Sequence, residues 1–215
     1  MPDPVSCFPL GVGAVTLTLA DEISPGTHQH IQAIAEALTR DPPAGLRDIV
    51  PAYTTLSVFF DPGLVAFETV RDQLLGLHQS VGVGPVRPGQ EWVIPVRYDG
   101  PDLAEVASGT GLSPEEIVTR HTGRSYRVYL IGFVPGFAFL GELDPRLVLP
   151  RRENPRQRVP AGAVAIAGAQ TGIYPLETPG GWHLIGRTDT RPFDLARDPA
   201  VLFKVGDQVR FEAIP

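Results

Sequence analysis

The sequence predicts an α+β region at the N-terminus, followed by a mostly-β region that forms a small barrel or sandwich. Up to residue 80, period-two apolar runs typical of strands alternate with apolar runs at helical spacing. The second half instead contains short apolar runs separated by glycine and proline turns. A content of 43% hydrophobic and 20% charged residues suits a packed protein and argues against disorder.

The first region is expected to follow the order strand, helix, strand, helix. Residues 14–19 alternate as a half-buried strand, and apolar residues from Ile31 to Leu38 repeat at the spacing of a helix over 25–40. A second strand at 56–60 precedes a second helix whose apolar face begins at Phe67. This order predicts a small sheet with both helices on one face.

Residues 82–90, GVGPVRPGQ, show no periodicity and are rich in glycine and proline. Such a stretch is typical of a linker. We therefore expect two domains, residues 1–84 and residues 85–215, and a chain of 215 residues is long enough for two small domains.

The second region is expected to begin with a strand at 92–98 and a short helix at 101–111. The run Ser113-Pro114-Glu115-Glu116 predicts a helix start, because it combines a capping serine, a proline suited to the first turn and a glutamate that completes a capping box. We expect that helix to end at Gly123 and a strand to follow at 125–133. Further short strands are expected in AVAIAG, WHLIG, VLFKV and QVRFEAI.

Composition excludes several functions. The formal charge of −6 argues against sequence-independent binding of nucleic acid. Lys204 is the one lysine, so the sequence has no phosphate-binding P-loop. Cys7 is the one cysteine, and the five histidines show no metal-binding spacing. No apolar run is long enough to span a bilayer and no signal pattern opens the chain, so we expect a cytoplasmic protein without a metal site of its own.

Arginines are concentrated in one proline-rich segment, where five fall within 13 residues: Arg146, Arg151, Arg152, Arg156 and Arg158. Proline stiffening means that these guanidinium groups lose less freedom on binding, and their planar fork suits phosphate or carboxylate oxygens. The alternative is a solvated basic loop, or a face for an acidic partner protein.

Two further segments have the composition of a small-molecule site. Residues 132–141, GFVPGFAFLG, place aromatic residues between turn formers directly after a strand, so that they either wall a pocket or plug the end of a barrel. Residues 170–188, QTGIYPLETPGGWHLIGRT, combine Gly180-Gly181, which permit close approach to the backbone, with several polar side chains. Apolar walls with a few polar groups are typical of ligand sites.

The chain resembles a known family over its whole length. The resemblance is carried by VPAGAVAIAG, QTGIYP and PGGWHLIGRT, extends to IPVRYDGPDLAEVA, GLSPEEIVTRHT and VGDQVRF, and continues more weakly through DIVPAYTTLSVFFDP. These segments are similar to the B subunit of the bacterial ATP-dependent 5-oxoprolinase. The same family includes allophanate hydrolase subunit 1 and the Kip inhibitor of a sporulation kinase.

The resemblance implies a small α+β N-terminal domain followed by a cyclophilin-like β-barrel domain. It also implies two partners: a C-type subunit, which has a related barrel and belongs to the allophanate hydrolase subunit 2 family, and a lactam-opening A-type subunit. Together with this chain they convert 5-oxoproline to glutamate. ATP, accompanied by Mg²⁺, would phosphorylate the amide oxygen of the resonance-stabilised lactam, so that water can open the ring.

Under this resemblance we assign roles as hypotheses. Arg151 and Arg152 are expected to bind phosphate, and Arg158 and Arg187 to stabilise the transferring phosphoryl group. His121 matches a family histidine at a helix end and is a candidate for proton transfer, with capping or packing as the alternative. The flat substrate is expected to contact the aromatic and glycine-rich segments through Phe133, Pro135, Gly136, Phe137, Gln170, Thr171, Tyr174, Gly180, Gly181, Trp182 and Thr188.

The chain departs from the family pattern at two places. In the segment that more usually reads SPGFPYLGGL, Val134, Ala138, Phe139 and Glu142 differ. Phe139 replaces a tyrosine, so no role rests on a hydroxyl there. Asp189 stands where the family tends to have proline, which either loosens the loop or brings a carboxylate near the site.

Two other functions stay open at this point. A regulatory protein that inhibits a sensor histidine kinase would use the barrel as a protein-binding surface without chemistry. A carboxyltransferase component would act on urea-like substrates with carboxybiotin.

Overall fold

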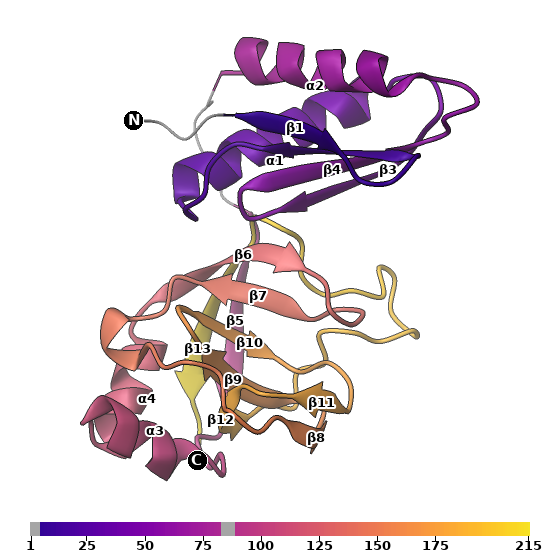
Figure 1. The fold of residues 1–215 in the computed structure, drawn as a ribbon. Helices are drawn as coiled ribbons and strands as arrows, with labels where there is room; N and C mark the ends of the chain where they lie inside the picture. The colour runs from indigo at the N-terminus through magenta and orange to yellow at the C-terminus, as the bar shows by residue number, and fades with distance from the viewer. Residues whose placement is uncertain (1–4, 83–88) are drawn as a thin grey trace. The chain divides into compact units, whose positions relative to one another are not determined.

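The computed structural model describes residues 5–82 and 89–215, and a compact unit lies within each of these ranges. Each unit has its own sheet (Figure 1). The buried hydrophobic side chains of each unit also cluster separately. Most of the expected linker, including the expected boundary between residues 84 and 85, lies outside the described residues.

The first unit is a four-stranded antiparallel sheet with two helices on one face (Figure 1). The strands lie in the order β1 (Ser6–Pro9), β2 (Ala14–Thr18), β4 (Thr55–Phe60) and β3 (Leu46–Ala52). The apolar sides of helices α1 (Pro25–Arg40) and α2 (Phe67–Ser80) share one buried cluster with alternate residues of β2 and β4. The four expected elements, β2, α1, β4 and α2, occur in the expected order on a common sheet, whereas strands β1 and β3 were not expected.

The second unit contains a seven-stranded sheet that is nearly closed into a barrel. The strand order is β12 (His183–Arg187), β9 (Ala163–Ala167), β10 (Gln170–Ile173), β7 (Ala138–Gly141), β6 (Ser125–Ile131), β13 (Gln208–Ala213) and β5 (Glu91–Val96). Neighbouring strands are antiparallel except β13 and β5, which are parallel. An antiparallel bridge between Arg97 and Arg187 then joins the two ends of this order. We call this junction the seam.

Shorter elements complete the second unit: helices α3 (Leu103–Thr110) and α4 (Pro114–Thr122), a 3-10 turn η1 (Pro145–Leu147), and a two-stranded sheet of β8 (Arg156–Val159) and β11 (Thr178–Gly180). The capping box of α4 is present, since Ser113 Oγ accepts a hydrogen bond from Glu116 N at 3.2 Å and Glu116 Oε2 accepts one from Ser113 N at 2.8 Å. The sequence therefore places the start of this helix correctly.

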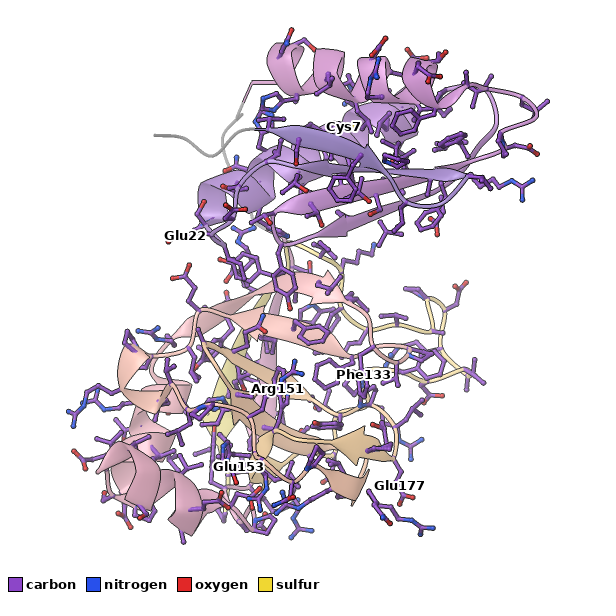
Figure 2. The ribbon with its side chains drawn as sticks, in the orientation of Figure 1. Cys7, Glu22, Phe133, Arg151, Glu153 and Glu177 are labelled. Carbon is purple, nitrogen blue, oxygen red and sulfur yellow. The ribbon has the colours of Figure 1, made fainter. Side chains whose placement is uncertain are left out.

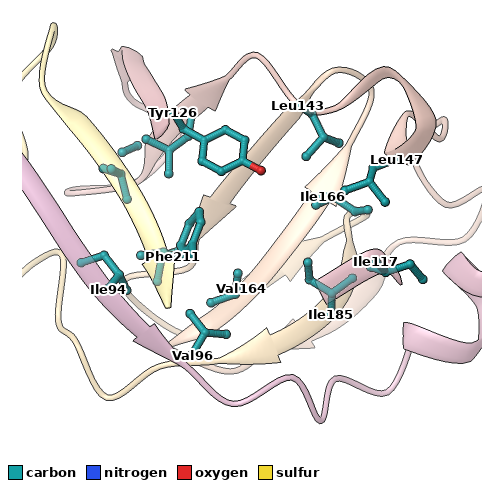
Figure 3. Close-up of a cluster of buried hydrophobic side chains, with 14 of the residues drawn as sticks. Ile94, Val96, Ile117, Tyr126, Leu143, Leu147, Val164, Ile166, Ile185 and Phe211 are labelled. Carbon is teal, nitrogen blue, oxygen red and sulfur yellow. The ribbon is translucent and has the colours of Figure 1, made fainter. Parts of the chain in front are cut away.

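Two buried layers lie on either side of β9. Val164 and Ile166 point into the barrel, where they pack with residues such as Tyr126 and Phe211 (Figure 3). The alternate alanines of β9 face outward against a second cluster, the outer aromatic cluster, which contains Phe137, Phe139, Tyr174 and Trp182. A strand that is buried on both faces reads as a continuous apolar run, as AVAIA does.

One expected strand is not formed. In VLFKV, residues 201–205, only Val201 makes a strand-like bridge, with Phe193. A turn follows, in which Asp207 Oδ2 accepts a hydrogen bond from Lys204 N at 2.9 Å. Phe203 is nevertheless buried in the barrel, so the apolar pattern of this segment reflects burial without regular structure.

Candidate functional site

A cleft of about 600 Å³ lies on the outside of the barrel, beside the seam. Its floor includes Ala163 of β9 and Leu184 of β12, and its two walls are β8 with the turn that follows it and the segment 99–101. Its charged lining residues are Asp99, Arg156, Arg158, Arg187 and Asp189. The cleft therefore combines an apolar floor with a rim of arginines and aspartates.

The wall at residues 99–101 is held against β12 by backbone contacts. Gly100 N donates to Ile185 O at 3.3 Å, and Asp102 N donates to Leu184 O at 3.0 Å. A Cβ atom on Gly100 would overlap the carbonyl oxygen of Leu184. Glycine at this position therefore lets the wall approach the barrel closely enough to shape the cleft.

Behind this wall, Asp102 is a buried carboxylate whose side chain is only 3% exposed. Its Oδ1 accepts hydrogen bonds from Arg152 Nη1 at 3.0 Å and Arg156 Nη2 at 2.5 Å. Its Oδ2 accepts from Arg156 Nη1 at 2.8 Å and Leu184 N at 2.7 Å. Arg152 also contacts Glu105. Asp102 thus holds Arg156 in place at the cleft. Arg152 and Arg156 are both already paired with carboxylates of the protein.

The two arginines of the seam form ion pairs across it. Arg187 Nε donates to Asp99 Oδ2 at 2.9 Å, and Arg187 Nη2 lies 2.8 Å from the same oxygen. Arg97 Nη1 donates to Asp189 Oδ2 at 3.2 Å. All four side chains are substantially exposed, and exposed pairs contribute little stability. Asp189 therefore does bring a carboxylate to the cleft.

Arg158 is the most exposed arginine of the cleft, with 83% of its side chain accessible. It lies two residues after Arg156 on β8, so both side chains project from the same face of that strand. Glu177 Oε1 lies 3.9 Å from Arg158 Nε, and the glutamate is itself on the surface (Figure 2). Arg158 is thus accessible to a ligand.

The expected aromatic walls form the buried outer aromatic cluster instead. Phe137 makes edge-to-face contacts with Trp182 and Tyr174, with ring centroids 5.4 and 5.2 Å apart, and Trp182 is only 5% exposed. Phe139 belongs to β7, so it is not part of the loop. Because Ala163 and Leu184 belong both to this cluster and to the cleft floor, the aromatic residues support the cleft without lining it.

The turn between β6 and β7 carries Phe133, Pro135 and Gly136. Phe133 (Figure 2) is 64% exposed and has a φ of 71°. Its ring makes an edge-to-face contact with that of Phe137. Pro135 is exposed, and Gly136 packs against Pro192 and Phe193. None of these residues lines the cleft.

The paired glycines have a structural explanation. A Cβ atom on Gly180 would overlap the hydroxyl oxygen of Tyr174, and Gly181 O accepts a hydrogen bond from Arg152 N at 2.8 Å. Burial raises the pKa of the Tyr174 hydroxyl above its usual value. The close approach expected for a ligand is therefore made by a side chain of the protein itself.

His121 and Thr171 lie in the barrel core. His121 Nδ1 is 2.7 Å from Tyr98 Oη, and His121 Nε2 is 2.8 Å from Thr171 Oγ1. Because the Thr171 hydroxyl donates to Ala165 O, Nε2 carries the proton and Nδ1 accepts from Tyr98. Burial lowers the pKa of His121 to about 3. These contacts favour a packing role for His121. His121 does not line the cleft, which also argues against proton transfer there.

Of the residues expected to form the site, Arg158, Arg187 and Thr188 meet in the cleft. Arg151 is exposed on the loop before β8 (Figure 2), and Gln170 is half-buried at the start of β10. Asp99 and Asp102 were not expected. The sequence feature that could have indicated these two aspartates is the segment YDGPD before α3. Asp102 does not cap that helix with its side chain, so capping rules do not reveal its role.

Within residues 5–82 and 89–215, no three histidine, cysteine, aspartate or glutamate side chains are grouped to hold a metal ion. In the same ranges, no helix has the length and apolar character needed to cross a bilayer.

The sequence matches the family model described as "Carboxyltransferase domain, subdomain C and D" over residues 5–203. The chain belongs to this family. Its relatives include the B subunit of 5-oxoprolinase from Bacillus subtilis (strain 168), which is 38% identical over 95% of this chain and 91% of the relative. The B subunit of 5-oxoprolinase from Escherichia coli O157:H7 is 39% identical, over 95% of this chain and 94% of the relative.

Several solved structures resemble this chain. TTHA0988 shares 45% identity and a TM-score of 0.83 over 94% of this chain, which spans only 40% of TTHA0988. A protein of Pyrococcus horikoshii, PH0987, is 40% identical with a TM-score of 0.57, over 97% of both chains. Urea carboxylase of Kluyveromyces lactis has a TM-score of 0.83 at 16% identity, over 98% of this chain and 22% of the enzyme, which shows the shared fold alone.

Proposed function

We propose that this chain is the B subunit of an ATP-dependent 5-oxoprolinase, a component that works only with a C-type partner and a lactam-opening A-type partner. The relatives named as B subunits of 5-oxoprolinase, which align along nearly their whole length, support this proposal. The structural observation that carries it is the convergence of Arg158, Arg187 and Thr188 on one cleft.

The cleft suits a small, flat molecule that carries a carboxylate. Arginine forks bind carboxylates with two parallel hydrogen bonds, and Arg158 and Arg187 stand at the rim. Ala163, Leu184 and Pro101 offer an apolar surface to one face of a five-membered ring. 5-Oxoproline has both features, a carboxylate and a lactam ring.

ATP would supply the activation that the resonance-stabilised lactam needs, by phosphorylating its amide oxygen. The residues expected to bind phosphate do not fit that task here. Arg152 is engaged by Asp102 and Glu105, and Arg151 lies outside the cleft. We therefore give this chain the binding and orientation of the lactam, and no step of the nucleotide chemistry.

Reconstitution tests the proposal. The purified chain, mixed with its C-type and A-type partners, is expected to form glutamate from 5-oxoproline only when ATP is present. Omission of this chain should abolish turnover, and Arg187→Ala should lower kcat/KM at least about tenfold, the loss typical of a charge-assisted hydrogen bond. Folded components that give no glutamate would disprove the proposed function.

A second candidate is carboxyl transfer, which the description of the matching family model favours. This chain would then act on a urea-like substrate with carboxybiotin. The distinguishing measurement is transfer of labelled bicarbonate to substrate in the presence of a biotin carboxylase and its biotinylated carrier. Label transfer to urea without glutamate formation from 5-oxoproline would favour this second function.

A further inference from the structure

We propose that two exposed apolar side chains, Phe133 and Leu195, form a docking patch for the C-type partner. The inference rests on the proposed function and adds the surface through which this chain recognises that partner. Its basis is the way in which the backbone holds the two side chains in the solvent, the packing of the two loops that carry them, and the position of these loops beside the cleft.

Phe133 lies at the centre of an unusual turn. Val134 N donates to Gly132 O at 2.9 Å, which closes a three-residue γ-turn around Phe133. The φ of 71° at Phe133 identifies the form of this turn that is rare and strained. Phe137 N donates to Val134 O at 3.1 Å and Gly132 N donates to Phe137 O at 3.0 Å, so the backbone is fixed around the turn. Strained residues of this kind concentrate at functional sites.

Packing inside the protein does not account for the ring of Phe133. One edge of the ring meets Phe137, with centroids 5.7 Å apart, and most of the residue remains exposed (Figure 2). Glycine would adopt the same φ without strain. The sequence instead keeps a large aromatic side chain at this position, which indicates that the ring contacts something outside the chain.

Leu195 is held in the solvent by a second loop, residues 191–200. Asp194 N donates to Ala200 O at 2.9 Å, and Arg197 N donates to Asp194 O at 3.1 Å. The Arg197 guanidinium donates four more hydrogen bonds of 2.9 to 3.2 Å to backbone carbonyl oxygens, those of Arg191, Pro192, Pro199 and Ala200. Leu195, between Asp194 and Arg197, is 84% exposed. A loop that is already ordered loses less entropy when it binds.

The two loops pack against each other. Gly136 has a φ of 81°, and a Cβ atom on it would lie 2.7 Å from Phe193 Cβ and 3.1 Å from Pro192 O. Glycine at position 136 therefore lets the turn that carries Phe133 contact the loop that carries Leu195. Most of the binding energy of a protein interface comes from a few well-placed side chains, and these adjacent, fixed loops present two.

The second loop begins at the cleft. Thr188 and Asp189 line the cleft, and the three residues from Asp189 to Pro192 reach at most about 11 Å. A protein that docks on Phe133 and Leu195 therefore stands close to the edge of the cleft. Under the proposed function the C-type partner acts with this chain on the lactam before the A-type partner opens the ring. The C-type partner is therefore the one that has to reach this position.

The lengths of the relatives supply a second reason for such a surface. TTHA0988 carries this fold within a longer polypeptide, because this chain spans only 40% of it. The B subunits of 5-oxoprolinase are instead matched over 91% and 94% of their own length. A separate subunit has no covalent link to its partner and depends on its surface for recognition. Aromatic side chains are enriched at the centres of such interfaces.

The test is the dependence of turnover on the concentration of the C-type partner in the reconstituted enzyme. Phe133→Gly removes the ring but suits the positive φ, so this variant should be at least as stable as the wild type in urea unfolding. The concentration of C-type partner that gives half-maximal turnover should rise about tenfold. At saturating C-type partner, kcat, the KM for 5-oxoproline and the half-maximal concentration of the A-type partner should stay within about twofold.

Two further variants complete the comparison. Leu195→Ser should also raise the half-maximal concentration of the C-type partner severalfold. Val12→Ser, which changes an apolar residue of the first unit that is 88% exposed, is the matched control and should leave it unchanged.

Three results would overturn the inference. The first is an unchanged half-maximal concentration of the C-type partner with both Phe133→Gly and Leu195→Ser. The second is a raised KM for 5-oxoproline at saturating C-type partner, which would place Phe133 on the substrate. The third is a larger effect on the half-maximal concentration of the A-type partner, which would give the patch to that protein.

Failure of the proposed function would be recognised separately, because the wild-type mixture would then form no glutamate. In that case sedimentation velocity of the chain with the C-type protein decides the inference. A complex that is weakened by Phe133→Gly and Leu195→Ser, and not by Val12→Ser, would support it. Absence of a complex would overturn it, as would self-association of this chain that the same two variants abolish.

Discussion

His121 shows how a titratable residue can serve the core of a protein. It ends helix α4 inside the barrel, where its ring stacks on Phe211 with centroids 4.5 Å apart. Tyr98 and Thr171 satisfy both ring nitrogens, so the neutral imidazole fits without an unpaired polar atom. A proton would add a buried charge with no carboxylate among these contacts.

We predict that His121 makes the stability of the barrel unit dependent on pH. Its folded pKa is about 3, whereas the ordinary value is 6.5, so below pH 6.5 the unfolded state binds a proton that the folded state does not. Stability contributed by His121 is therefore complete above pH 6.5 and is lost as pH falls toward 3. Between pH 7 and pH 5 the loss should be about 2 kcal/mol.

Urea unfolding of the wild type and His121→Gln at pH 7, 6 and 5 measures this effect. The variant should be less stable at pH 7 and should lose less stability on acidification. An equal loss in both proteins would show that His121 does not carry the dependence.

At the scale of elements, local sequence patterns succeeded where amphipathic periodicity and caps coincide. Helices α1 and α4 are examples, since Ser24 and Ser113 both cap as such residues do. Strands β1 and β3 were missed. β3 lies at an edge and contains Asp48 and Pro51, and edge strands carry charges and proline that hide the period-two pattern.

The junction of α3, β8 and β12 depends on Asp102, and we predict that Asp102→Ala destabilises the barrel unit by about 3 kcal/mol. The substitution leaves the partly buried Arg156 without its carboxylate and leaves Arg152 with Glu105 alone. Loss of one partner of a buried pair costs roughly this amount. Denaturant unfolding gives the measurement. Asp72→Ala, which removes an exposed ion pair with Arg71, should change stability by less than about 0.5 kcal/mol; equal effects would contradict the role of Asp102.

At the scale of the whole molecule, the barrel and two arginines of the cleft were predictable, but the aspartates and the apolar residues that line the cleft were not. Arg158 and Arg187 were chosen because arginine is the available anion-binding residue. Asp99 meets Arg187 across 88 positions of sequence, through the bridge that closes the barrel, and no local pattern encodes such a contact. Trp182 was misplaced for a related reason, because an aromatic residue in a glycine-rich segment fits a site rim and a buried cluster equally well.

The barrel core of the second unit and the helix–sheet core of the first unit contain no residues in common. We therefore predict that the two units fold separately. Fragments 1–84 and 85–215 should each unfold in one cooperative transition, because each unit has its own apolar core. The smaller fragment should be the less stable, since a chain of this size buries a smaller share of its surface.

Tryptophan fluorescence gives a direct comparison, because both tryptophans of the chain, Trp92 and Trp182, belong to the second unit. Emission from fragment 85–215 should match that of the full chain, with Trp182 shielded among Phe137 and Tyr174. A shift of that emission toward the value of exposed tryptophan would mean that the barrel needs residues 1–84 to fold. The cleft would then depend on the whole chain, since its floor and the outer aromatic cluster share Ala163 and Leu184.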